Sequence, residues 1–224
     1  HVSFSLQKGE CLGIVGESGC GKSTLARMIA GITPTSDGKV LLEGKDYIGL
    51  KGGEKRRFRR NIQMVFQDPL SSFSPRMKVG TYLMEARRNF DGISKAEGLK
   101  EVGRLLQEVG LPEEFVSRYP HELSGGQLQR VAIARAISIQ PKLLICDEAT
   151  GALDVSIQNQ IAQLLVKLVE EKNIGCLFIG HDLALVRSVS QRIAVMYLGR
   201  IVELLESETL GEKAMHPYTK MLLG

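Results

Sequence analysis

A glycine-rich stretch near the start of the chain, GESGCGKS from Gly16 to Ser23, fits the phosphate-binding pattern G-x-x-x-x-G-K-[ST] with no mismatch. Gly16, Gly19 and Gly21 allow positive φ angles, so several backbone N–H groups can point at one anion. A lysine at the position of Lys22 reaches the β and γ phosphates of a nucleotide, and the hydroxyl of Ser23 is a ligand for Mg²⁺. The stretch therefore predicts a nucleotide site.

The segments on either side must hold this loop in place. Residues 11–15 form a continuous apolar run that is typical of a buried strand, and residues 24–30 have the apolar spacing of a helix that ends at Gly31. A helix that begins at the loop adds its partial positive charge to a phosphate site. A glycine-rich turn that matches the pattern by chance is the alternative, and the strand-turn-helix context argues against it.

Two acids follow another apolar run, at residues 143–146. Such a run fits a central parallel strand, and a carboxylate at the carboxyl end of that strand lies beside a phosphate loop. We expect Asp147 to hold Mg²⁺ and Glu148, which points elsewhere, to polarise a water molecule for attack on the γ-phosphate. The alternative is that both acids only cap the following turn.

A second glycine-rich turn, LSGGQ at residues 123–127, precedes a helix predicted over residues 128–139. This turn offers a second backbone site for an anion. Because the first loop already surrounds the phosphates of its own nucleotide, we expect the second turn to serve the nucleotide of another subunit. A helix cap made by Ser124 alone stays open as an alternative.

The other apolar patterns predict an α/β fold with a mainly parallel sheet. Further strands are expected at residues 2–6, 40–42, 62–66, 174–179, 193–197 and 201–204, with a last hairpin at Gly199. A helix is expected at residues 157–169. Strand signals are few in residues 70–125, where helical patterns such as residues 99–109 dominate. We therefore expect one domain, residues 1–224, with a core of residues 1–69 and 126–224 and an inserted helical subdomain at about 70–125.

Composition agrees with a soluble globular protein. The chain has 43% hydrophobic and 24% charged residues and a formal net charge of +4. Residues 51–60 concentrate six basic side chains, which favours a solvated face over an anionic partner such as membrane headgroups or RNA. The four cysteines lie far apart without metal-ligand spacing, which indicates reduced, structural thiols. No apolar run approaches the ~20 residues that cross a bilayer.

The chemical motifs occur in the order and approximate spacing of one known family, and the chain resembles ATP-binding-cassette (ABC) ATPases over nearly its whole length. The resemblance rests on the phosphate loop, Gln67 after an apolar strand, LSGGQ, LLICDE, the Ala152-Leu153-Asp154 turn and His181. Finer features look like the importer subgroup that takes up oligopeptides, dipeptides or nickel: FQDPLSSFSPR, LSGGQLQRVAIARA, HDLALV and the terminal HPYTKMLL.

The resemblance implies a P-loop NTPase core with an N-terminal antiparallel β portion, and it implies roles for single residues. Glu148 is the implied general base, and His181 holds the γ-phosphate and the lytic water. Gln67 contacts the metal and that water where the membrane partner is sensed. The implied catalytic set is completed by Lys22, and the implied metal ligands are Ser23, Gln67 and Asp147. The implied nucleotide-binding residues are Gly16, Glu17, Ser18, Gly19, Cys20, Gly21, Lys22, Ser23, Thr24 and Gln67, and, across a dimer, Ser124, Gly125, Gly126, Gln127 and Asp154.

The same resemblance implies cofactors, partners and a location. The cofactors are ATP and Mg²⁺. The partners are a second ATPase subunit, identical or paralogous, two transmembrane permease subunits and, indirectly, an extracytoplasmic substrate-binding protein, with no nucleic acid. The implied location is peripheral, on the cytoplasmic face of the inner membrane.

Two features depart from the family pattern. Gly151 stands where the family usually has a serine, which removes a hydroxyl from the turn that contains Asp154. The aromatic residue that stacks on adenine in the family is expected before the start of this chain, which lacks an initiator Met and begins in a predicted strand; Phe4 is predicted to be a core residue.

A non-transport ABC-type ATPase, which drives a DNA-repair, chromosome-maintenance or translation clamp, is the alternative function. The clamp class needs long heptad-repeat arms between the phosphate loop and LSGGQ, and residues 24–122 contain none. The translation class needs two cassettes in one chain. A binding module without hydrolysis is disfavoured because Glu148 and His181 are both present.

Overall fold

The structure is a computed structural model that describes residues 2–151 and 153–224. A central sheet has six strands in the order β4-β5-β6-β1-β7-β8, and β2 and β3 pair in a separate antiparallel sheet. The strands are β1 Cys11–Val15, β2 Leu41–Leu42, β3 Lys45–Asp46, β4 Ile62–Val65, β5 Leu143–Asp147, β6 Gly175–Ile179, β7 Arg192–Tyr197 and β8 Arg200–Glu206. All neighbours in the central sheet are parallel except β7 and β8. The predicted mainly parallel α/β fold is confirmed.

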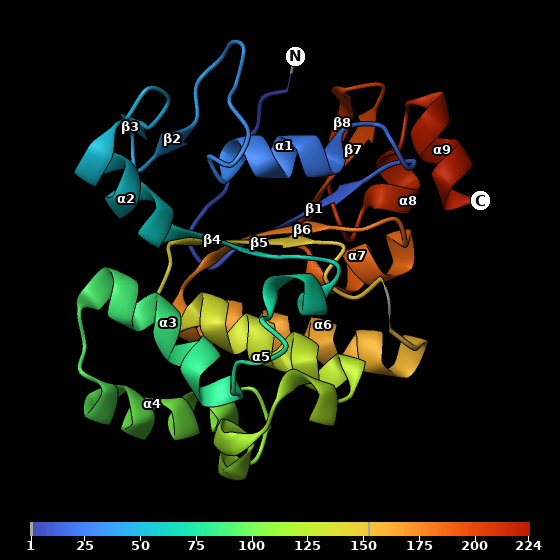
Figure 1. The fold of residues 1–224 in the computed structure, drawn as a ribbon. Coiled ribbons are helices and arrows are strands. Elements are labelled where there is room, and N and C mark those ends of the chain that lie inside the picture. The colour runs from blue at the N-terminus through green and yellow to red at the C-terminus, as the bar shows by residue number, and fades with distance from the viewer. Residues whose placement is uncertain (1, 152) are drawn as a thin grey trace.

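Helices cover both faces of the central sheet (Figure 1). α1 lies on one face near the small β2-β3 sheet, whereas α3, α5 and α6 lie on the other. The α-helices are α1 Lys22–Ile29, α2 Gly52–Asn61, α3 Val79–Asp91, α4 Lys95–Glu108, α5 Gly125–Ile137, α6 Val155–Lys172, α7 Leu183–Val189, α8 Leu210–Lys213 and α9 Pro217–Leu223, and the 3-10 helices are η1 Pro69–Ser72, η2 Glu113–Ser117 and η3 Pro120–Glu122.

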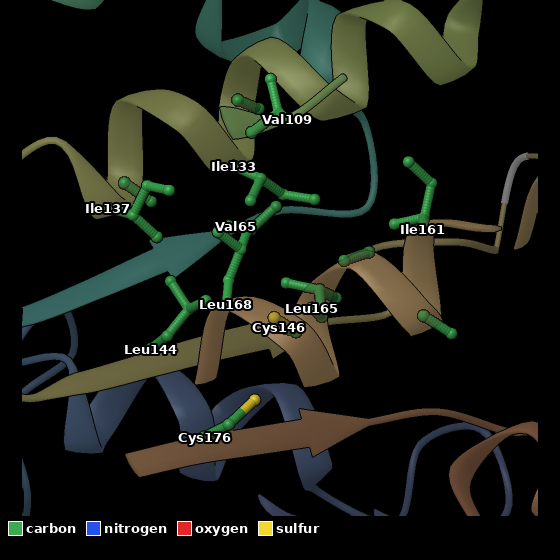
Figure 2. Close-up of a cluster of buried hydrophobic side chains, with 14 of the residues drawn as sticks. Val65, Val109, Ile133, Ile137, Leu144, Cys146, Ile161, Leu165, Leu168 and Cys176 are labelled. Carbon is green, nitrogen blue, oxygen red and sulfur yellow. The ribbon is translucent and has the colours of Figure 1, made fainter. Parts of the chain in front are cut away.

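The sheet separates two hydrophobic cores because successive side chains of each strand point to opposite faces. In β5, Leu144 and Cys146 belong to the larger core with α5 and α6, and Ile145 belongs to the smaller core under α1. Figure 2 shows the larger core, where Ile133 and Ile137 of α5 lie over this face of the sheet. When both faces of a strand are buried, the side chains that point to either face are apolar. This explains the continuous apolar runs in the sequence.

Register brings the carboxyl ends of three strands to one edge of the sheet. Ile179 of β6 pairs with Ile14 of β1 on one side and with Asp147 of β5 on the other. The loop that follows Val15, the acids that end β5 and the segment that follows β6 therefore emerge together. This edge is the place where open α/β sheets bind ligands.

The segment between β4 and β5 is helical throughout its described elements, which are η1, α3, α4, η2, η3 and α5. The buried face of α3, which includes Val79 and Leu83, joins the same core as α5 and the sheet. Ser94 begins α4 with a capping box, in which its hydroxyl accepts from Glu97 N–H and the Glu97 carboxylate accepts from Ser94 N–H. This segment therefore packs onto one face of the sheet through shared apolar residues.

The predicted strand at residues 2–6 is wrong. The expected alternation is present, because Val2, Phe4 and Leu6 are half-buried against the smaller core while the residues between them are exposed. The backbone has no strand ladder, however, and the carbonyl of Ser5 accepts instead from the guanidinium of Arg192. An alternating pattern reports which side chains are buried, and it leaves open whether a neighbouring strand is there to pair.

The basic run of residues 51–60 forms α2, whose aromatic residue Phe58 is buried against Tyr47. Its Arg60 pairs with Asp91 of α3, and the other basic side chains are exposed, as expected for a solvated face. All four cysteines are buried and free. Within the described residues, no helix is long and apolar enough to cross a membrane.

Candidate active site

The phosphate loop connects β1 to α1, and its glycines have the backbone angles that the sequence predicts. Gly16, Gly19 and Gly21 have φ angles of 155°, 82° and 108°. A Cβ on Gly16 would lie 2.2 Å from the carbonyl oxygen of Met196 in β7, so this position has no room for a side chain. Gly21 is the N-cap of α1 in the left-handed region, where glycine carries no steric cost.

Lys22 is buried within this loop. Its ammonium donates to the carbonyl oxygens of Gly16 at 2.7 Å and Glu17 at 2.9 Å. An ammonium group has three donors, and the third lies 3.9 Å from Cys20 Sγ, a weak acceptor that a ligand oxygen can replace. Lys22 therefore closes the loop into a ring and places a positive charge inside it, which fits the binding of a phosphate group.

Ser23 and Asp147 join the two halves of the predicted metal site. Ser23 Oγ donates a hydrogen bond of 2.8 Å to Asp147 Oδ1. The pKa of the Asp147 carboxyl is raised above its ordinary value, mainly because the group is buried. The hydrogen bond from Ser23 opposes this shift, and the nearby Glu148 adds to it. The positive charges of Arg27 and Lys22 also lower the pKa. A hydroxyl and a carboxylate are the oxygen ligands that Mg²⁺ prefers, so this donor set fits the ion.

Glu148 turns away from the strand that carries Asp147. Its φ angle is 48°, its N–H donates to Ile179 O at 3.0 Å, and its carbonyl accepts from Gly151 N–H at 2.9 Å. Glu148 Oε1 lies 4.0 Å from Nδ1 of His181, which follows β6 and is exposed. The turned backbone therefore points the Glu148 carboxylate at the imidazole and leaves Asp147 beside the phosphate loop.

Gln67 lies next to the turn that follows these acids. A Cβ on Gly151 would be 3.5 Å from Gln67 Nε2 and 3.5 Å from the Glu148 carbonyl oxygen. The preceding carbonyl, of Phe66, accepts from the buried side chain of Gln129 in α5 at 3.5 Å. Gln67 thus lies at the same edge of the sheet as Glu148.

The LSGGQ turn starts α5 and is built as a helix cap. Ser124 Oγ accepts from Gln127 N–H at 3.4 Å, and Gln127 Oε1 accepts from Ser124 N–H at 2.9 Å. A Cβ on Gly126 would lie 2.7 Å from Cγ2 of Ile157, so this glycine lets α5 approach α6 closely. The helix starts at Gly125, earlier than the predicted residue 128. Ser124 therefore caps α5, and both Ser124 and Gly125 are exposed to solvent.

The turn between β5 and α6 ends at Asp154. Asp154 is the N-cap of α6 and its side chain makes no capping bond, so the exposed carboxylate is available to another molecule. The predicted turn of residues 152–154 includes Ala152, which lies outside the described residues. Glu17, Ser18 and Thr24 of the predicted nucleotide-binding set are exposed around the loop, whereas Cys20 is buried beneath it.

Two contacts on the outer side of the loop could not be predicted from the sequence. The N–H of Glu17 donates to the phenol oxygen of Tyr218 at 2.7 Å, and the N–H of Gly199 donates to the carbonyl of Cys20 at 2.9 Å. Both partners belong to the carboxyl-terminal part of the chain. The HPYT motif that contains Tyr218 was visible in the sequence, but nothing in its spacing connects it with a loop 201 residues away.

Comparisons with known proteins agree with this geometry. The family model described as ABC transporter matches residues 1–151. The chain is 51% identical over 223 residues to a probable peptide ABC transporter ATP-binding protein of Sinorhizobium fredii, covering 100% of this chain and 63% of that protein. It is 49% identical to the oligopeptide transport ATP-binding protein OppF of Salmonella typhimurium, covering 100% of this chain and 67% of that protein. The chain thus spans about two thirds of the length of these relatives.

Solved structures of similar fold include a dimer of the ATP-binding cassette MJ0796 in a post-hydrolysis state with ADP and phosphate. That structure matches with a TM-score of 0.82 and 31% identity, over 92% of this chain and 89% of its own. CbiO1 from Clostridium perfringens, part of the transporter complex cbiONQ, matches with a TM-score of 0.83 and 31% identity. The match covers 94% of this chain and 82% of CbiO1. From the family match and these relatives, the chain belongs to the ABC transporter family.

Proposed function

We propose that this chain is the ATP-binding and ATP-hydrolysing part of an importer subunit, in which binding and hydrolysis of ATP drive the uptake of peptides. The observation that carries the proposal is the convergence at one sheet edge of a phosphate loop, the Ser23–Asp147 pair and the Glu148–His181 pair. The names of the relatives in Sinorhizobium fredii and Salmonella typhimurium support peptides as the cargo. Nickel is the other cargo class of the same subgroup.

In this proposal each residue near the phosphates has one task. The loop N–H groups and Lys22 bind the β and γ phosphates, and Ser23 and Asp147 would hold Mg²⁺, which would neutralise phosphate charge. Glu148 takes a proton from the water whose oxygen attacks the γ-phosphorus, while His181 and Gln67 orient that water. The bond to the β–γ bridging oxygen breaks, and ADP and inorganic phosphate are the products.

The proposal requires a second ATPase subunit, identical or paralogous. Ser124 and Gly125 are exposed at the start of α5, so the Ser124 hydroxyl and the N–H groups of Gly125 and Gly126, which the capping box does not use, can meet the γ-phosphate held by the other subunit. Asp154 lies at the start of α6 with a free carboxylate for the same interface. Two permease subunits and an extracytoplasmic binding protein complete the importer, with this subunit on the cytoplasmic face of the membrane and residues 70–125 as the helical subdomain of one domain.

Uptake in the source organism tests this function. Cells that lack the gene are expected to lose the uptake of labelled oligopeptides, and the wild-type gene restores it, whereas the gene for Glu148→Gln does not. Labelled nickel is assayed in parallel. Loss of nickel uptake alone would mean that the cargo is nickel and not a peptide. Unchanged uptake of both would contradict the import function.

A further inference from the structure

The phosphate loop is held from outside by a residue that no part of the proposed chemistry uses. Tyr218, in α9 near the end of the chain, accepts a hydrogen bond from the N–H of Glu17 through its phenol oxygen at 2.7 Å. Glu17 is the second residue of the loop, directly after Gly16. The bond therefore joins the carboxyl-terminal helix to the point where the loop leaves β1.

The peptide groups around Glu17 are fixed on two sides. The Glu17 carbonyl accepts from the ammonium of Lys22 at 2.9 Å and from Cys20 N–H at 3.3 Å, both inside the loop. Its N–H has the phenol of Tyr218 as its partner outside the loop. One lysine inside the loop and one tyrosine outside it therefore hold the first turn of the loop. Loss of the tyrosine hydroxyl would leave the Glu17 N–H without this partner, and a buried backbone N–H without a partner is costly.

Tyr218 is itself held rigidly enough to serve as an anchor. Only 7% of the residue is exposed, and its ring lies against the ring of Tyr197 with the centroids 4.5 Å apart. Its N–H donates to Nδ1 of His216, which caps α9. Glu203 of β8 accepts from the N–H groups of Met215 and His216 at 2.7 and 2.8 Å, and so ties the start of the helix to the sheet.

We infer that Tyr218 is a positioning residue for the phosphate loop, which keeps the loop in the conformation that binds the phosphates of ATP. The inference rests on the proposed function, because it names a residue that acts through the loop on the same nucleotide. Tyr218 accepts from the Glu17 N–H, whereas Lys22 donates to the Glu17 carbonyl, so the proposed effect of Tyr218 on the phosphates runs through the loop backbone. Docking of the HPYT segment and nucleotide affinity are therefore coupled.

The substitution Tyr218→Phe isolates this effect, because it keeps the ring and its packing and removes only the acceptor. When the Glu17 N–H loses its partner, other loop conformations gain population and the apparent affinity falls with the population of the competent one. The loss of one such bond predicts that the Kd and the KM for ATP rise about fivefold. The kcat is expected to change less than about twofold, because Glu148 and His181 are untouched.

Three measurements separate positioning from a merely structural role. Calorimetric titration with ATP and with ADP gives the affinity, and steady-state kinetics gives the split between KM and kcat. Hydrogen exchange of the backbone amides of residues 16–22 reports the loop directly, and faster exchange at Glu17 is expected in Tyr218→Phe. Tyr197→Phe is the matched control, because it removes a hydroxyl from the neighbouring ring without removing the acceptor for Glu17.

A second variant tests the same coupling without altering the tyrosine. Glu203→Ala removes the acceptor for Met215 and His216 and loosens the start of α9, so it is expected to raise the KM in the same direction. Unchanged ATP affinity in Tyr218→Phe, beside a wild-type protein that binds ATP, would overturn this inference alone. A wild-type protein that binds no ATP would contradict the proposed function as well.

Discussion

Ser23 Oγ and Asp147 Oδ1 lie 2.8 Å apart and share a hydrogen bond, although 124 positions separate them in the chain. The serine ends the phosphate loop and the aspartate ends β5, and the parallel register of β1, β6 and β5 brings the two ends together. One hydroxyl and one buried carboxylate at this point form a compact set of oxygen ligands. The pair therefore supports a prediction about metal dependence.

Ser23→Ala is expected to raise the Mg²⁺ concentration that gives half-maximal ATP hydrolysis by about tenfold, because it removes one proposed ligand and frees the Asp147 carboxylate. The measurement is a titration of the hydrolysis rate with Mg²⁺ at saturating ATP. Ser36→Ala, an exposed serine outside the loop, is the control and should not move the midpoint. An unchanged midpoint in Ser23→Ala would remove Ser23 from the metal site.

Lys22→Ala is expected to reduce ATP hydrolysis to a few per cent of the wild-type rate or less, a loss of about 2 kcal/mol or more of transition-state stabilisation. The structure adds a second consequence, because the ammonium also bonds the carbonyls of Gly16 and Glu17. Hydrogen exchange in residues 16–22 should therefore become faster in this variant. The exposed Lys45→Ala serves as control, and a Lys22→Ala protein with near-normal turnover would contradict the assignment.

Glu148→Gln is expected to keep ATP binding, to slow hydrolysis by roughly 10²–10⁴-fold and to accumulate an ATP-bound dimer. The amide preserves the volume of the side chain but cannot accept the proton, and the loss of charge removes repulsion with the γ-phosphate. Size-exclusion chromatography with ATP and Mg²⁺ measures the dimer. A wild-type rate in the variant would contradict the role of Glu148 as the base.

Adding Ser124→Arg to Glu148→Gln is expected to abolish the dimer, because the arginine blocks the turn that we propose to face the second subunit. Ser124 also caps α5, so its loss costs about 1 kcal/mol of stability in the monomer. Ser94→Arg in the Glu148→Gln background is the matched control, because Ser94 forms the same capping box at the start of α4. A dimer that survives in the Ser124→Arg variant as well as in the Ser94→Arg control would contradict the role of LSGGQ between subunits.

Local patterns predicted the parts of the fold that depend on one segment at a time. The apolar run that ends at Asp147, the loop from Gly16 and the capping serine at position 124 each carry their own signal in a few residues. The predicted strand at residues 2–6 failed because a ladder needs a second strand, which a local pattern does not report. The contact between Glu17 and Tyr218 was out of reach for the same reason, since it depends on how the last helix docks onto the first loop.

Gly151→Ser is expected to leave stability unchanged or to raise it slightly, by up to about 1 kcal/mol, because replacing a glycine restricts the unfolded chain. A Cβ at this position would make ordinary contacts of 3.5 Å with Gln67 and with the Glu148 carbonyl oxygen. Thermal unfolding measures the change. Gly126→Ser is the contrasting variant and should lower the Tm, because its Cβ would lie 2.7 Å from Ile157.

The Glu203 carboxylate gives the docking of α9 a predicted pH dependence. Burial raises the pKa of Glu203, but hydrogen bonds from the backbone N–H groups of His216 and Met215 and the charge of His216 outweigh burial and lower it from its ordinary value of 4.5. A carboxylate with a lowered pKa stabilises the folded protein fully above the unfolded pKa, and this contribution is lost as the pH falls through the folded pKa. The stabilisation by the Glu203 carboxylate is therefore expected to be lost below pH 4.5.

Glu203→Gln makes this pH dependence measurable, because the amide oxygen can still accept from Met215 and His216 but carries no charge. The Tm of the wild-type protein should exceed that of the variant at about pH 7, and the difference should shrink as the pH falls below 4.5. Differential scanning calorimetry across this range measures both proteins, with the exposed Glu208→Gln as control. A Tm difference that stays constant as the pH falls through this range would mean that the charge of Glu203 does not hold the helix, and the anchor of Tyr218 would then depend on the neutral hydrogen bonds alone.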